Sequence, residues 1–252
     1  MHLLDRRPLR ATFVTSGKYC RMIAMKIDTK TAVIIPVFNE EAVVKGVVNN
    51  VLKHYSTVVC IDDGSTDGSI AEIEKTKAYI IKHPINMGQG AALQTGIEFA
   101  LSLPDIEYLA TYDSDGQHRI EDMKTMVQAI EGGEYDVVLG SRFLGTTTGA
   151  GFLRALVLKA AVRFSNVVSG LKLTDAHNGL RVLSRDFASE LQITLPDMAH
   201  ASEILEIIAQ TKAKFTEIPV TIDYTEYSKA KGQSLLNAIN ISFDILLRKA
   251  TR

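Results

Sequence analysis

Short apolar runs alternate with amphipathic stretches along most of this chain. The runs Thr31–Phe38, Thr57–Ile61 and Tyr108–Tyr112 are rich in β-branched and aliphatic residues and have the length of buried strands. Between the first two runs, valines from Val43 to Val51 recur at the spacing of one helix face. This alternation predicts an α/β fold with a single, mostly parallel sheet and flanking helices.

The alternation continues toward the C-terminus, interrupted by a segment rich in glycine and threonine. That segment, residues 143–151, is expected to be a mobile loop. Pro219 in the last apolar run predicts an edge strand or a bulge. Further helices are expected up to about residue 77, over about 89–103, 121–130 and 152–168, after Pro196, and over about 235–248. Further strands are expected over 78–81, 135–142, 174–183 and 215–224.

Acidic residues follow three of the expected strands. Glu40 comes after the first strand, Asp62 and Asp63 after the second, and Asp113 and Asp115 after the fourth. The carboxyl ends of parallel strands meet at one edge of a sheet, which is where ligands bind in open α/β folds. We therefore expect these carboxylates to converge on a ligand site.

The residue after the first strand also predicts a helix start. Asn39 is a preferred N-cap residue, and Glu40 and Glu41 would then lie in the first turn, where the helix dipole favours acidic side chains. The sequence therefore predicts a helix that begins directly after this strand.

The acidic pair after the fourth strand continues into an amide. A strand of period two places Asp113, Asp115 and Gln117 on one side. Carboxylate and amide oxygens are hard ligands that suit Mg²⁺ or Mn²⁺, and a cation there clamps the phosphates of a nucleotide. The same residues also fit an ordinary polar turn. The acidic residues expected at the other strand ends of the same edge favour the metal site over this alternative.

The composition narrows the class of protein. The chain is 46% hydrophobic and 23% charged, with a net charge of −1. It has no excess of basic residues that would indicate nucleic-acid binding. Its two cysteines make no disulfide framework and fit a cytoplasmic location. We find no apolar run of transmembrane length. Residues 1–28 lack a periodic pattern, which predicts a poorly ordered extension before a single domain over 29–252; a basic arm that touches a membrane or a partner is the alternative.

Taken in order, the motifs resemble those of glycosyltransferase family 2 on a GT-A fold, the nucleotide-diphospho-sugar transferase fold. They are I-I-P-V-F-N-E (34–40), I-D-D-G-S-T-D (61–67), N-M-G-Q-G-A-A (86–92), Y-D-S-D-G-Q-H (112–118) and G-S-R-F (140–143). Later segments resemble the polyprenyl-phosphate, or dolichyl-phosphate-mannose-synthase-like, branch. These are D-A-H-N-G-L-R (175–181) and K-A-K-G-Q-S (229–234).

The resemblance implies roles for the residues that bind the donor. Pro36 and Glu40 would line the nucleotide pocket, with Glu40 toward the ribose. Asp63 would hydrogen-bond the base, and Gly88 would let the donor approach the backbone. Asp113 would contact the ribose or the sugar.

It also implies roles around the phosphates. Asp115 with Gln117 would hold Mg²⁺ or Mn²⁺ on the diphosphate, and Arg142 would face the phosphates of donor or acceptor. Lys229 and Lys231 would close over them. The branch often carries an arginine in that last loop, and lysine lacks its bidentate fork.

Together these roles imply an inverting, metal-dependent transferase that uses a UDP-, GDP- or dTDP-linked sugar. The acceptor is a polyprenyl phosphate or a saccharide. A lipid phosphate needs no base, whereas a sugar hydroxyl needs a carboxylate within hydrogen-bond reach. The candidates for that base, Asp175, Asp197 and Glu203, fit helix caps or first-turn acids equally well. The expected catalytic set is therefore Asp115 and Arg142 with Asp175 or Glu203.

Several readings stay open at this point. The amphipathic helix over about 235–248 either lies at the inner face of the cell membrane or packs on the domain or another subunit. The resemblance implies a role in cell-envelope polysaccharide or glycolipid assembly. The alternatives are a non-catalytic nucleotide-sugar-binding subunit of a membrane complex and, ranked lower, a sugar-phosphate nucleotidyltransferase.

Overall fold

The computed structural model describes most of the central part of the chain. The described residues are 27–148, 159–160, 162–163, 165–167, 169–195, 199–223 and 227, and the side chains at 147 and 148 are not included. Residues 1–26 of the expected N-terminal extension, the expected helix over 235–248, Asp197, Lys229 and Lys231 lie outside these residues. The domain begins one residue earlier than expected, because Asp28 is already part of the first strand.

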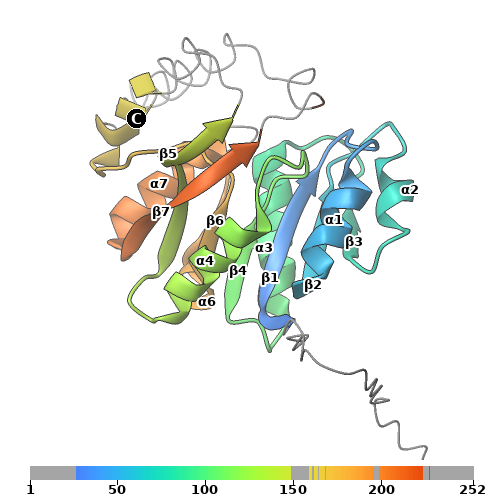
Figure 1. Ribbon diagram of the computed structural model, residues 1–252, viewed down its shortest axis with the longest axis horizontal. Coiled ribbons are helices and arrows are strands. Elements are labelled where there is room, and N and C mark those ends of the chain that lie inside the picture. Colours follow the sequence, from blue (N-terminus) through green and yellow to red (C-terminus); the bar gives the residue numbers. More distant parts are fainter. Residues whose placement is uncertain are drawn as a thin grey trace, which may run out of the picture.

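The described chain is organised around a seven-stranded sheet in the order β3-β2-β1-β4-β6-β5-β7 (Figure 1). Only β6 runs against its neighbours in this sheet, and the other pairs are parallel. The expected mostly parallel sheet is therefore confirmed. The strands are β1 Asp28–Val37, β2 Tyr55–Asp62, β3 Tyr79–Lys82, β4 Tyr108–Thr111, β5 Val137–Thr148, β6 Arg181–Ser184 and β7 Phe215–Asp223.

This topology fixes where the loops meet. Six strands end at one edge of the sheet, and β6 begins at that same edge because it is antiparallel to β4 and β5. The loop that leads into β6 therefore joins the loops that follow β1, β2, β4 and β5. The sheet thus gathers segments from both halves of the chain at one edge.

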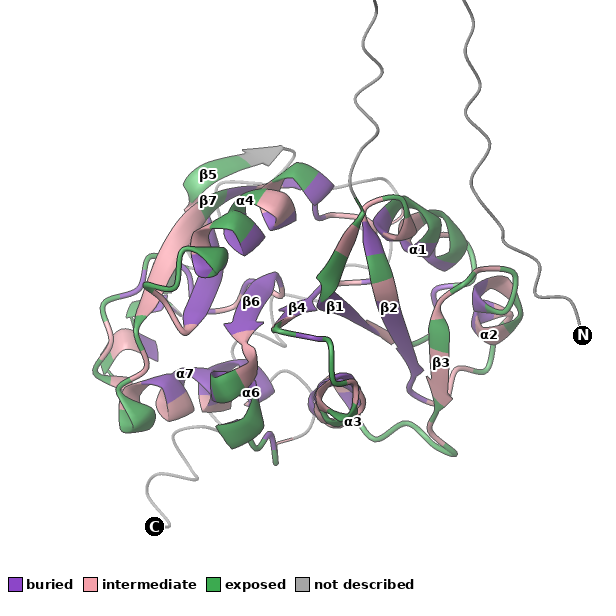
Figure 2. Cartoon of the chain, turned by 90° about the horizontal axis from the view of Figure 1, so that it is seen from below, coloured by how far each residue is buried: buried purple, intermediate pink, exposed green. Residues whose placement is uncertain are grey.

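Helices cover both faces of the sheet. They are α1 Val44–Leu52, α2 Ser69–Ile73, α3 Gln89–Ser102, α4 Ile120–Glu131, α6 Arg185–Glu190 and α7 His200–Thr211. One apolar cluster joins Ile34 to α3, α6 and α7, and the other joins Val33 and Ile35 to α1 and α4. Adjacent residues of β1 thus face opposite layers, which is why this central strand is apolar at successive positions. Figure 2 shows buried positions along β2 and on the sheet-facing sides of α1 and α4.

The first helix does not begin where the sequence predicts. It starts at Val44, and no acidic residue lies in its first turn. Asn39 instead adopts a left-handed φ of 55°. Its side-chain oxygen accepts a hydrogen bond from the backbone N–H of Thr66, at 2.9 Å. The predicted N-cap was wrong because Asn39 ties the loop after β1 to the loop after β2.

The expected glycine- and threonine-rich loop is also corrected in its first part. Residues 143–148 continue β5, which pairs with β7 from Thr146 to Thr148. Pro219 lies on edge strand β7, where the β5–β7 register shifts, so both features expected of it are present. Helix α6 was not predicted. None of the helices in the described part of the chain has the length and apolar content needed to cross a bilayer.

Candidate active site

Carboxylates from three strand ends gather at the edge of the sheet, as their positions in the sequence predict. Glu40 follows β1, Asp63 follows β2, and Asp113 and Asp115 follow β4. Glu40 and Asp63 are buried, whereas Asp113 and Asp115 are partly exposed. Pro36 lies in β1 opposite Ile61, so β1 and β2 stay paired up to the loops.

The Asp63 carboxylate anchors the loop between β3 and α3. It accepts hydrogen bonds from the backbone N–H groups of Met87, at 2.9 Å, and Gly88, at 2.8 Å. It also contacts Nδ1 of His83 at 2.7 Å, and Nε2 of His83 lies 3.0 Å from the Thr95 hydroxyl on α3. Asp63 therefore fixes the loop that opens α3.

Glycines allow this loop to approach its neighbours. Gly88 precedes α3 with a φ of 91°, a conformation that other residues rarely adopt. A Cβ atom on Gly90 would lie 2.1 Å from the carbonyl oxygen of Leu195. The N-terminus of α3 can pack against the segment before α7 only because residue 90 has no side chain.

Asp113 is bonded by two side chains and backed by a glycine. Its Oδ2 lies 2.9 Å from Nε2 of the buried His118, and its Oδ1 accepts from Nε2 of Gln89 at 3.3 Å. Behind the carboxylate lies Gly179, where a Cβ atom would come within 2.2 Å of Oδ2. The Thr111 hydroxyl donates to the Gly179 carbonyl at 2.6 Å and fixes this approach.

The two carboxyl groups after β4 differ in acidity. Desolvation, followed by the charge of Asp113, raises the pKa of Asp115 to about 6. Desolvation is the largest influence on Asp113 and opposes its charged form, but the hydrogen bond with His118 and the charges of His118, Arg181 and His200 together outweigh it and lower the pKa of Asp113. Glu40 adds to the rise at Asp115, so the negative charges of these loops act on one another.

The residues after β4 fit a partial site for a hard cation. Among the described residues, no group of three or more His, Cys, Asp or Glu side chains is arranged to hold a metal. Mg²⁺ in nucleotide sites commonly takes only one or two carboxylates, with phosphates and water completing its shell. Asp115 and Gln117 supply such oxygens, and the N–H of Gln117 donates to Oδ1 of Asp115 at 3.0 Å.

A residue near the C-terminus also reaches this edge. The hydroxyl of Tyr227 donates to Oε2 of Glu40 at 2.8 Å. Desolvation and this bond raise the pKa of Tyr227 to about 12. Nothing in the sequence indicated this contact between Tyr227 and Glu40.

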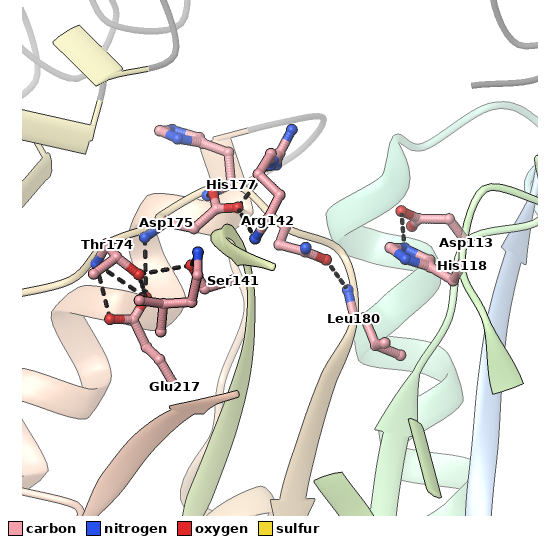
Figure 3. Close-up of polar contacts among 11 residues, drawn as sticks. Asp113, His118, Ser141, Arg142, Thr174, Asp175, His177, Leu180 and Glu217 are labelled. Carbon is pink, nitrogen blue, oxygen red and sulfur yellow. Dashed lines mark hydrogen bonds and ion pairs between the residues drawn. The ribbon is translucent and has the colours of Figure 1, made fainter. Parts of the chain in front are cut away.

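On the other side of the edge lies a buried ion pair (Figure 3). Nε of Arg142, on β5, donates to Oδ2 of Asp175 at 2.6 Å, and the Arg142 backbone N–H donates to the same oxygen at 3.1 Å. The two side chains are 12% and 2% exposed. His177 lies nearby, and burial lowers its pKa to about 4, so its ring is neutral at neutral pH.

This arrangement matches a known family. The model of the family described as "Glycosyl transferase family 2" matches residues 32–191, which include the loops after β1, β2, β4 and β5 and the segment before β6. The chain belongs to glycosyl transferase family 2. It is therefore a glycosyltransferase.

Two relatives of this glycosyltransferase are named for lipid-phosphate acceptors. The UDP-N-acetylglucosamine–dolichyl-phosphate N-acetylglucosaminyltransferase of Methanococcus voltae is 31% identical over 244 residues, which cover 88% of this chain and 97% of that protein. The polyprenol monophosphomannose synthase of Mycolicibacterium smegmatis is 25% identical over 227 residues, which cover 83% and 84%.

The fold is also that of solved glycosyltransferase structures. Glucosyl-3-phosphoglycerate synthase from Mycobacterium tuberculosis, in complex with Mn²⁺, UDP and phosphoglyceric acid, superposes with a TM-score of 0.66 at 16% identity. The match covers 88% of this chain and 84% of that one. This likeness establishes the GT-A fold of the present glycosyltransferase.

One candidate base of the glycosyltransferase is bonded elsewhere. Glu203 on α7 accepts hydrogen bonds from the backbone N–H groups of Thr194 and Leu195, at 2.9 and 2.8 Å, and from the Thr194 hydroxyl, at 2.6 Å. These bonds hold the segment that leads into α7. The role of Glu203 as a general base stays a prediction.

Proposed function

We propose that this glycosyltransferase transfers a sugar from a nucleotide-diphosphate sugar to a polyprenyl phosphate, with inversion and with Mg²⁺ or Mn²⁺. The observation that carries the proposal is the placement of two polar groups at one sheet edge. They are the Asp113-x-Asp115-x-Gln117 loop, of which Figure 3 shows Asp113, and the Arg142–Asp175 ion pair. Relatives named for dolichyl-phosphate and polyprenol monophosphate chemistry support the choice of acceptor.

The donor would bind over the ends of β1, β2 and β4. In this proposal Pro36 and Glu40 line the nucleotide pocket, with Glu40 toward the ribose, and Asp113 contacts the ribose or sugar. Asp63 reads the base, and Gly88 lets the donor approach the backbone. The bonds of Asp63 to the loop before α3 support a further task for it, which is to hold that loop in place.

The divalent cation would be held by Asp115 and Gln117. When bound, it supplies charge neutralisation on the leaving diphosphate. Some structures of glucosyl-3-phosphoglycerate synthase with UDP also contain Mn²⁺ or Mg²⁺. Asp115 must be ionised to bind a cation, and its pKa of about 6 lets the carboxylate form at neutral pH.

The acceptor phosphate would lie against Arg142. A guanidinium suits phosphate because its planar N–H groups match the oxygens in direction and charge. Lys229 and Lys231 would close over the phosphates. A lipid phosphate is already anionic and attacks the anomeric carbon without a base, which agrees with Asp175 being engaged with Arg142.

The other acceptor class needs a different assignment. A saccharide hydroxyl would need Asp175, Asp197 or Glu203 as a base, and the bonds of Asp175 and Glu203 favour the phosphate acceptor. We also propose that residues 28–252 form one domain and that the enzyme works in the cytoplasm at the inner face of the membrane. Its product would enter cell-envelope polysaccharide or glycolipid assembly.

Nucleotide release tests this function. Purified protein is given UDP-, GDP- and dTDP-sugars with Mn²⁺ or Mg²⁺, with and without polyprenyl phosphate, beside Asp115→Asn. The matched control is Asp105→Asn, an exposed acid in the loop before β4, at the opposite end of that strand. We expect release that prefers one donor, rises with the lipid and is lost only in Asp115→Asn. Nucleotide binding without release under any condition would favour a non-catalytic subunit instead.

A further inference from the structure

The carboxylate of Glu217, on β7, accepts several hydrogen bonds in a polar network that includes the loop of Asp175, the partner of Arg142 (Figure 3). Its carboxylate accepts the backbone N–H of Thr174 at 2.8 Å, the Thr174 hydroxyl at 2.8 Å and the backbone N–H of Asp175 at 3.0 Å. One side chain thus fixes two successive residues of the loop that presents Asp175. Because Asp175 binds Arg142, Glu217 acts on Arg142 through that loop.

A second chain of bonds links Glu217 to the strand that carries Arg142. Thr174 has one hydroxyl hydrogen, which it donates to Glu217, so in its 2.6 Å contact with Ser141 it accepts. The Ser141 oxygen in turn accepts the backbone N–H of Leu144, at 3.3 Å. The residues on both sides of Arg142 are therefore tied to the same carboxylate.

The strand needs this support because it bulges at Arg142. In the β5–β7 register Ser141 pairs with Pro219 and Thr146 with Thr221, so residues 142–145 face a single residue of β7. Bulges redirect side chains and are frequent beside active sites. A Cβ atom on Gly145 would lie 2.1 Å from the Val220 carbonyl oxygen, so the bulge is packed tightly against β7.

We propose that Glu217 is a positioning residue for Arg142, which it orients through Asp175 and through the bulge without contacting the guanidinium in any bond described above. The inference rests on the proposed function only where Arg142 is assigned to the acceptor phosphate. The orientation of Arg142 can be measured without any activity.

The direct test is solvent exchange of the Arg142 Nε–H, followed by ¹⁵N NMR and assigned by its absence in Arg142→Lys. In the wild type this hydrogen is bonded to a buried carboxylate, so it should exchange slowly. Glu217→Gln replaces one acceptor oxygen with an NH₂ donor that faces the N–H donors of residues 174 and 175. We expect exchange to become about tenfold faster, as in Asp175→Asn.

The matched control lies at the other end of the same strand pair. Asp136 accepts the backbone N–H of Lys214, at 2.8 Å, and no bond between described residues joins it to the Arg142 network. Asp136→Asn should lower the melting temperature and leave Nε–H exchange unchanged. Thr174→Val, which removes only the hydroxyl link, carries the test if Glu217→Gln does not fold.

Kinetics adds a second readout. Glu217→Gln should raise KM for polyprenyl phosphate by about tenfold and leave the donor KM within about twofold, and Glu217→Ala should be worse than Glu217→Gln. The double variant Asp175→Asn/Glu217→Gln should lose less affinity for polyprenyl phosphate than the two single losses combined.

Unchanged Nε–H exchange in folded Glu217→Gln would overturn the inference. A wild type that transfers no sugar would instead overturn the proposed function, and the exchange test would still decide the role of Glu217.

Discussion

The proposed site has two halves that are built in different ways. The donor half comprises Glu40, Asp63, Asp113 and Asp115, and the acceptor half comprises Arg142, Asp175 and Glu217. In the donor half, most carboxylates bind residues that are close in the sequence: Asp115 binds a residue two positions on, Asp113 one five positions on, and Asp63 one 25 positions on. Glu40 is the exception, because it binds Tyr227, 187 positions away. In the acceptor half, Arg142 binds a residue 33 positions away, and Glu217 binds one 43 positions away. The donor half is thus assembled mainly from loops in the first half of the chain, with contacts from Gly179 and Tyr227 in the second half. The acceptor half depends on the pairing of β5 with β7.

The halves also differ in electrostatic balance. The donor half places two carboxyl groups close enough that Asp113 contributes to the raised pKa of Asp115, an arrangement that a cation relieves. In the acceptor half, the charge of Arg142 is compensated by the Asp175 carboxylate, which also accepts the backbone N–H of His177 at 3.2 Å. The donor half thus carries unbalanced negative charge, whereas the acceptor half holds its arginine in a fixed orientation against a carboxylate.

Among these variants, Asp115→Asn should cause the largest loss of activity, because it removes a carboxylate of the donor half. Loss of the carboxylate should lower kcat by about 10²- to 10³-fold, because charge on the leaving diphosphate is no longer offset. Titration of Mn²⁺ into the protein with nucleotide, followed by calorimetry, should show weakened metal binding at an unchanged melting temperature. Full activity with Mn²⁺ bound elsewhere would contradict the assignment.

Arg142→Lys should damage the acceptor half alone. Lysine keeps the charge but loses the Nε–H that binds Asp175, so KM for polyprenyl phosphate should rise between about 10- and 100-fold. Nucleotide release to water should stay close to the wild type. Steady-state kinetics with both acceptors measures the split, and equal losses in the two reactions would place Arg142 on the donor phosphates instead.

Gly179→Ala tests the contact between the two halves, because residue 179 lies in the loop before β6 and packs against Asp113. Its Cβ would come within 2.2 Å of the Asp113 carboxylate, so we expect a loss of about 1–3 kcal/mol in the free energy of unfolding. The donor KM should rise as well. Gly46→Ala is the control: it lies in α1 with no atom near its Cβ and should not destabilise the protein. Equal unfolding curves for the two variants would show that the approach of residue 179 to Asp113 is loose.

Asp63→Asn should have the smallest effect and separates two roles. Asp63 anchors the loop before α3 by accepting hydrogen bonds from the backbone N–H groups of Met87 and Gly88, and it loses part of this hydrogen bonding when one oxygen becomes an NH₂ group. The KM values for all nucleotide-sugars should then rise together, by about three- to tenfold. A change in the ratio between UDP- and GDP-sugars would mean that base reading is its main role.

The contrast between the halves also explains what the sequence could predict. Apolar runs followed by acids placed Glu40, Asp63, Asp113 and Asp115 at one edge, because strand direction alone determines where such residues go. The N-cap predicted at Asn39 failed because a partner 27 positions away competes for its side chain.

The acceptor half was less visible in the sequence. Glycines and threonines after Arg142 indicated a loop, yet pairing with β7 keeps residues up to 148 in β5. Glu217 lies in an ordinary strand pattern with no motif around it. Its bonds depend on the alignment of β5, β7 and the loop before β6, which only the fold determines.

The central claim is that a metal-assisted donor site faces a site for an acceptor phosphate. The most direct measurement is transfer of a labelled sugar to polyprenyl phosphate and, in parallel, to polyprenol without its phosphate, each with Mn²⁺ or with a chelator. The account predicts labelled lipid only with the phosphate and the metal together. Equal transfer to polyprenol, or transfer that survives removal of the metal, would contradict it.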